Sequence, residues 1–81
     1  MKHEKLPNLF AYRVKQLRKE KGLTQLELAQ EVGLSKGTVA MWEVNKREAS
    51  FSTLFKLASF FNTTIDYLLG YDLIQDLEVL E

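Results

Sequence analysis

Apolar residues recur three and four positions apart along most of the chain, and the periodic stretches begin at residues that commonly cap helices. The first stretch follows Pro7, with Asn8 as a candidate cap and Gly22 as a stop after about residue 21. Its candidate inward residues are Leu9, Tyr12, Val14 and Leu17. Only residues 77–81 are ambiguous between helix and strand, so the pattern predicts an all-α fold.

Two short segments come next, and both have clear boundary signals. Thr24 and Glu27 form a T-x-x-E capping box, and Gly33 can end the helix that the box begins. Ser35 can cap the second helix, which runs to about Asn45, a residue that tolerates left-handed backbone. The candidate inward residues of this region are Leu28, Val32, Leu34, Val39 and Trp42.

The rest of the chain is also amphipathic. Ser50 can cap a helix over residues 51–61, whose apolar stripe is Leu54, Leu57, Ala58 and Phe61. Thr64 can cap a shorter helix that ends at Gly70, and apolar residues at 73, 77 and 80 continue the helical spacing. We therefore expect one five-helix domain over residues 1–71 and a short extension over residues 72–81.

Residues 24–43 meet the steric requirements of a helix-turn-helix motif. The small Ala29 lies where the two helices must approach closely, and Gly33 permits the left-handed turn between them. A generic helical hairpin with the same spacing is the alternative interpretation.

Charge is distributed unevenly, although the net charge is zero. Residues 1–56 contain all 11 Lys and Arg residues and six acidic residues, a net charge of +5. Residues 57–81 contain five acidic residues and no basic ones. One end of the molecule can thus face an anion while the other stays acidic. Ordinary solvated surfaces are the alternative.

Several classes of function find no support in the sequence. There is no cysteine, no cluster of metal ligands and no nucleophile beside a base, so we expect neither an enzyme nor a metal or cofactor site. The lone His3 is interpreted as an ordinary exposed side chain. No apolar run approaches the ~20 residues of a membrane span, and the N-terminus lacks a secretory signal, so we expect a cytoplasmic protein without a membrane role.

Residues 13–70 resemble the phage-repressor/Cro family of bacterial transcription regulators, often called Xre-like. The segments that carry the resemblance are KGLTQLELAQ (21–30), GLSKGTV (33–39) and TTIDYLLG (63–70). The family implies a five-helix, lambda-repressor-like domain that is encoded by a bacterium or a phage. It also implies that the third helix lies in the major groove of double-stranded DNA, usually in a homodimer on a palindromic operator.

By this resemblance, exposed residues near the start of the third helix read bases: Lys36, Gly37, Thr38 and Met41. Lys36 is expected to donate to guanine, and Met41 can only contact an apolar group such as a thymine methyl. Relatives carry hydrogen-bonding side chains such as glutamine at the positions of Gly37 and Met41. Glycine costs a helix about 1 kcal/mol relative to alanine, but it lets the backbone approach a base pair closely. Ordinary surface positions are the alternative for Lys36 and Met41.

The resemblance also implies residues that hold phosphates. Gln25, beside its cap Thr24, lies where free helix amides favour an anion, and further polar residues follow the third helix. The expected set is Thr24, Gln25, Ser35, Asn45, Lys46, Arg47 and Arg13. Val44 departs from the family, since it cannot donate a side-chain hydrogen bond to phosphate.

Two further sets of residues have structural roles in the family. Arg18 and Glu43 match a salt bridge between the first helix and the end of the third. The expected dimer surface consists of Ile65 and Tyr67, at family dimer positions, and of the apolar residues that follow, Leu73, Ile74, Leu77 and Leu80, for which docking on the core is the alternative. We interpret the chain as a sequence-specific DNA-binding regulator of transcription, and we expect it to act as a repressor. The alternative is a protein-interaction module, antitoxin-like or anti-repressor, that keeps the fold but reads DNA weakly.

Overall fold

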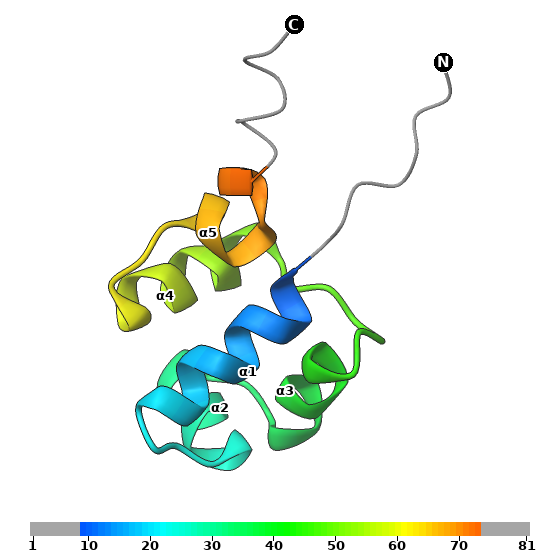
Figure 1. The fold of residues 1–81 in the computed structure, drawn as a ribbon. Helices are drawn as coiled ribbons and strands as arrows, with labels where there is room; N and C mark the ends of the chain where they lie inside the picture. Colours follow the sequence, from blue (N-terminus) through cyan, green and yellow to red (C-terminus); the bar gives the residue numbers. More distant parts are fainter. Residues whose placement is uncertain (1–8, 74–81) are drawn as a thin grey trace, which may run out of the picture.

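The computed structural model describes residues 9–73, which form five helices around one apolar core (Figure 1). The helices are α1 (Phe10–Glu20), α2 (Gln25–Val32), α3 (Lys36–Glu43), α4 (Phe51–Phe61) and α5 (Ile65–Leu69). Residues 71–73 are helical again after the turn at Gly70. No strand occurs within residues 9–73. The predicted all-α, five-helix fold is confirmed.

Local capping chemistry explains where most of these helices begin. In α2 to α5, the hydroxyl of the preceding Ser or Thr accepts the backbone N–H three residues later, which satisfies one of the free amides of the first turn. The four pairs are Thr24 with Glu27, Ser35 with Thr38, Ser50 with Thr53 and Thr64 with Tyr67. The caps expected from the sequence at these four positions are therefore present.

The five helices bury one set of apolar side chains. In Figure 1, α1 runs through the middle of the molecule, with α2 and α3 below it and α4 and α5 above it. Helix α1 packs against α3 and α5, and α4 packs against α2 and α5. The buried apolar residues are Phe10, Val14, Leu28, Ala29, Val32, Val39, Trp42, Leu54, Leu57, Ala58, Phe61 and Leu68. This core holds α2 and α3 against the rest of the domain.

Helix α1 differs from the sequence expectation in two respects. It begins at Phe10 after Leu9, which makes no side-chain capping bond, and the predicted cap Asn8 lies outside the described residues. Tyr12 was expected inside but is 64% exposed, whereas Phe10 is buried. Two residues turn a helix by about 200°, so Tyr12 lies on the side opposite Phe10. The inward stripe follows Phe10, Val14 and Leu17 instead.

The turn between α2 and α3 corrects a second expectation. Gly33 has a φ of 73°, and the N–H of Leu34 donates to the carbonyl of Ala29 at 2.9 Å, which closes α2. This reversal takes Leu34 out of the apolar stripe of α2. Its side chain is 38% exposed, so its expected place in the core is wrong. Ala29 is fully buried, as the close approach of two helices requires.

Candidate nucleic-acid interface

The first turn of α3 presents polar groups to solvent. Ser35, Lys36 and Gly37 are exposed, and Thr38 is half-buried. The Ser35 hydroxyl accepts the N–H of Thr38 at 3.2 Å and lies 3.0 Å from the Thr38 hydroxyl. Because this pair of hydroxyls is exposed, the turn offers an ordered set of donors and acceptors to a ligand.

The two faces of α3 differ sharply. Val39 and Trp42 are 0% and 1% exposed and anchor the helix in the core, whereas Met41 is 40% exposed. Lys36, Gly37 and Met41 therefore lie on the outer surface, as predicted from their spacing. Helix α3 is thus anchored in the core on one face and free on the other, so the free face could enter a groove of a duplex.

Gly37 is not required by the fold. A Cβ at this position would meet only the Ser35 hydroxyl oxygen, at 3.9 Å, and the φ of Gly37 is not in the left-handed region. Every other residue type except proline would give α3 a higher helix propensity. The absence of a side chain here thus has no structural cause within the described domain, and it leaves the backbone of α3 open to close approach.

The segment after α3 is exposed and basic. Asn45 has a φ of 62°, and the N–H of Lys46 donates to the carbonyl of Met41 at 2.8 Å, so the chain reverses tightly. Lys46, Arg47 and the apolar Val44 are all exposed next to this turn. Two cations thus lie just beyond the C-terminal end of α3, on a backbone whose course is fixed.

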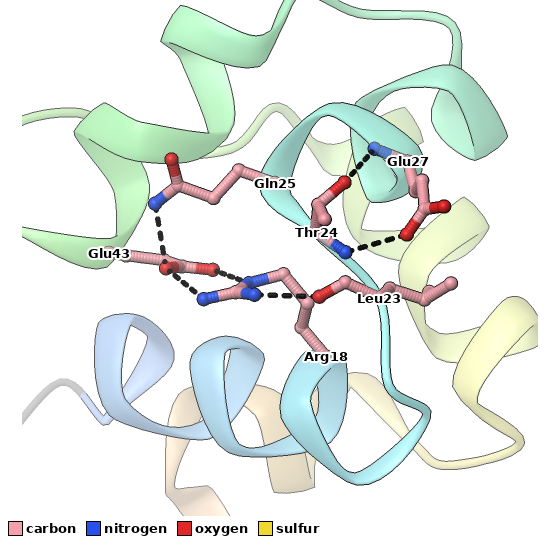
Figure 2. A network of polar contacts seen from close by, with 6 residues as sticks. All are labelled: Arg18, Leu23, Thr24, Gln25, Glu27 and Glu43. Atoms are coloured by element: carbon pink, nitrogen blue, oxygen red, sulfur yellow. Dashed lines mark hydrogen bonds and ion pairs between the residues drawn. The ribbon is translucent and has the colours of Figure 1, made fainter.

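A partly buried ion pair joins α1 to the end of α3 (Figure 2). Arg18 donates through Nε to Glu43 Oε2 at 2.7 Å and through Nη2 to Glu43 Oε1 at 3.0 Å. The side chain of Glu43 is only 3% exposed. The hydrogen bond to Glu43 raises the pKa of Arg18 above its ordinary value, against the opposing effect of burial. The expected pairing of Arg18 with Glu43 is thus present in the structure.

Two further residues complete this network. Arg18 Nη1 donates to the carbonyl of Leu23 at 2.7 Å, and Gln25 Nε2 donates to Glu43 Oε1 at 3.0 Å (Figure 2). Thr24 stands between them as the cap of α2, with its N–H donating to Glu27 Oε1 at 2.8 Å. One amide hydrogen of Gln25 is therefore already bound within the protein, which the sequence did not suggest.

This geometry agrees with the comparison with known families. A family profile described as Helix-turn-helix matches residues 14–68. The chain belongs to this helix-turn-helix family. The matched range runs from the middle of α1 through α5 and includes α3 and the turn after it.

Relatives of the helix-turn-helix domain include regulators and an antitoxin. The transcriptional regulator ImmR of Bacillus subtilis is 35% identical over 60 residues, which cover 74% of this chain and 47% of ImmR. Antitoxin HipB of Escherichia coli is 35% identical over 51 residues, which cover 63% of this chain and 54% of HipB. The chain thus spans about half the length of these two relatives.

A solved structure shows the same arrangement of helices. The P22 c2 repressor, crystallised in complex with a synthetic operator, has a TM-score of 0.73 and 28% sequence identity. The match covers 78% of this chain and 96% of that one. The helix-turn-helix domain described here thus has the fold of that phage repressor.

Arg13 makes its contacts at the α5 end of the domain. Its Nη1 donates to the Tyr67 carbonyl at 2.5 Å and to Asp72 Oδ1 at 2.6 Å, and its guanidinium lies 4.0 Å from the centre of the Tyr67 ring. The hydrogen bond from Arg13 lowers the pKa of Asp72. These contacts engage Nη1 of the guanidinium at the α5 end, and the expected phosphate contact of Arg13 stays a prediction.

The expected dimer residues are only partly accessible. Ile65 packs against the core, Tyr67 is half-buried under Arg13, and Leu73 is 53% exposed. Ile74, Leu77 and Leu80 lie outside the described residues. The contacts of these residues in an assembly stay a prediction.

An exposed aromatic pair was missed in the sequence. Phe51 and Phe55 are 67% and 58% exposed, and their rings meet edge to face at 4.9 Å between centroids. Their spacing of four residues places them on one side of α4, away from the stripe through Leu54 and Leu57. That spacing was the signal available in the sequence.

The described part of the chain contains neither a membrane-spanning helix nor a metal-binding cluster. None of the helices within residues 9–73 has the length and apolar character that crossing a membrane requires. The same residues contain no group of three His, Cys, Asp or Glu side chains placed to hold a metal ion.

Proposed function

We propose that this chain binds double-stranded DNA and regulates transcription, most simply as a repressor. The observation that carries the proposal is the outer face of α3, where exposed Lys36 and the Ser35–Thr38 hydroxyl pair flank a glycine that the fold does not require. Such a helix fits the major groove, where base edges offer hydrogen-bonding groups. Similarity to a repressor crystallised with operator DNA supports this function. Its place of action is then the cytoplasm of a bacterium.

The residues divide into two roles in this proposal. Lys36, Gly37, Thr38 and Met41 face the bases. The phosphate backbone is held by polar groups around them, namely Thr24, Gln25, Ser35, Asn45, Lys46 and Arg47. Arg18 and Glu43 stay inside the domain and keep α3 in place.

We also propose that two copies bind a palindromic operator. One α3 covers only a few base pairs, so a two-fold pair would increase the length of DNA that is read. Half-sites are then expected about 34 Å apart, or one turn of the duplex. In this proposal residues 1–71 are the DNA-binding domain and residues 72–81 are an extension of it. The two copies would contact each other through α5 and the residues that follow it. Sedimentation of the chain with and without operator DNA counts the subunits, and a single subunit bound tightly to a non-palindromic site would contradict the pairing.

Salt dependence tests the class of partner. A protein that neutralises several phosphates loses affinity steeply between about 50 and 200 mM salt, because bound counterions are released. Lys46→Ala should weaken binding to all duplexes about equally and reduce the slope against log salt by about one unit. Binding that changes little with salt would favour the alternative, a protein-interaction module, for which the similarity to antitoxin HipB is the supporting observation.

Gly37 offers a test that separates folding from binding. Gly37→Ala should stabilise the domain by up to about 1 kcal/mol, since alanine is the better helix former and its Cβ has space. Gly37→Gln should also fold, but a long side chain should change the preferred operator. Urea denaturation measures the first effect, and competition between duplexes measures the second. Unchanged DNA preference in Gly37→Gln would place this residue outside the groove.

A further inference from the structure

Helices α2 and α3 are connected at both of their ends. The turn at residues 33–35 joins the end of α2 to the start of α3. At the opposite ends, Gln25 in the first turn of α2 donates to Glu43 in the last turn of α3, at 3.0 Å (Figure 2). The side chain of Gln25 therefore links the two helix ends that the backbone does not connect.

The acceptor of this hydrogen bond, Glu43, is also bound by Arg18. Glu43 has a 3% exposed side chain and receives two hydrogen bonds from Arg18, which in turn donates to the Leu23 carbonyl just before α2. A hydrogen bond to a buried, charged acceptor is stronger than one between neutral exposed groups, because water does not compete for it. Gln25 thus ties α2 to a point that α1 already fixes.

We propose that Gln25 is a positioning residue, which sets the angle of α3 against α2 through its hydrogen bond to Glu43 and so determines how sharply the protein discriminates between operators. This inference rests on the proposed DNA binding. It goes further, because a phosphate contact by Gln25 would add affinity for every duplex, whereas control of the α3 angle acts on base reading. The amide nitrogen has a second hydrogen, so a phosphate contact is compatible with this role but does not replace it.

The test compares Gln25→Met with Gln30→Met. Methionine keeps the length of the side chain and removes the donor, and the Arg18–Glu43 pair remains to hold the fold. Gln30 lies on the same helix and is exposed, so its variant controls for loss of an amide from α2. Affinities are measured for the selected operator and for the same duplex altered at the base pairs that α3 reads.

Two results are expected from the binding measurements. Gln25→Met should reduce the ratio of the two affinities about three- to ten-fold, in the range of couplings between residues in direct contact. Gln30→Met should leave the ratio unchanged. Equal weakening of both duplexes by Gln25→Met would show a phosphate contact alone and would overturn the inference.

A measurement without DNA separates this inference from the proposed function. Amide hydrogen exchange is followed at residues 44–46, whose N–H groups bond to carbonyls of the last turn of α3. Exchange there should be faster in Gln25→Met than in the wild type, while the amides of α4 keep their rates. If the wild type binds no duplex, the proposed function fails, and the exchange rates still decide the link between α2 and α3. Equal exchange in both proteins would overturn the link itself.

Discussion

Helix α1 carries two arginines that form ion pairs with two different parts of the molecule, the end of α3 and the segment after α5. Arg18 pairs with Glu43, whose side chain is 3% exposed, and Arg13 pairs with Asp72, whose side chain is 41% exposed. The two arginine side chains are themselves equally buried, at 11% exposure. The environments of the two carboxylates therefore differ, and so should the contributions of the pairs to stability.

The difference shows how one helix serves two kinds of contact. At the α3 end, removing either partner would leave a charge away from water, which is costly. At the α5 end, water can solvate Asp72 when Arg13 is lost, so the pair contributes little. The α3 end is built to hold the proposed reading helix in one position. The Arg13 contact joins α1 to α5 and to the beginning of the C-terminal segment.

The largest effect is expected from Glu43→Ala. This change leaves the partly buried guanidinium of Arg18 without its carboxylate and removes the acceptor of Gln25, so the free energy of unfolding should fall by about 2–3 kcal/mol. Urea denaturation followed by circular dichroism measures the change. A loss of stability no larger than that expected for an exposed salt bridge would contradict the difference between the Arg18–Glu43 and Arg13–Asp72 pairs.

A smaller effect is expected from Arg18→Lys. Lysine keeps the charge but cannot bond Glu43 in fork geometry while also reaching the Leu23 carbonyl, so about 1–2 kcal/mol of stability should be lost. Arg13→Lys is the matched variant on the same helix and should cost less. The denaturation midpoints of the two variants are compared at one pH and salt concentration. Equal losses of stability would contradict the larger contribution assigned to the Arg18–Glu43 pair.

The sequence predicted the local features well and the long-range ones poorly. The caps at Thr24 and Ser35 and the left-handed Gly33 depend on neighbours within a few residues, so the residue types alone indicate them. The contact of Arg13 with Asp72 spans 59 positions, and nothing local distinguishes it from a surface cation. The contact of Arg13 with Asp72 therefore reflects tertiary packing that no periodicity records.

In the candidate site, too, local features could be predicted from the sequence pattern and contacts between helices could not. The outward direction of Lys36 and Met41 follows from helical spacing once Val39 and Trp42 are inside. The resemblance to the family supplied the pairing of Arg18 with Glu43. The bond from Gln25 to Glu43 could not be inferred, because it depends on how α2 crosses α3.

The smallest effect is expected from Asp72→Asn, which removes the exposed charge that Arg13 binds. Because the pKa of Asp72 is lower in the folded protein than in the unfolded one, this carboxylate adds stability above its unfolded pKa. That contribution is lost as the pH falls through the lowered pKa. The wild type and the variant should therefore converge in stability in acid and differ slightly at neutral pH. A difference that grows towards acid would have the wrong sign.

The central claim, that α3 reads base pairs, is tested most directly by selecting operators from random duplex DNA with the wild type and with Lys36→Ala. The wild type should enrich an inverted repeat with half-site centres about 10 base pairs, or a small multiple of that, apart. Lys36→Ala should cost about 1–3 kcal/mol on that operator and lose preference at one or two positions in each half-site. An unchanged preference in Lys36→Ala, or no enriched sequence for the wild type, would contradict the account.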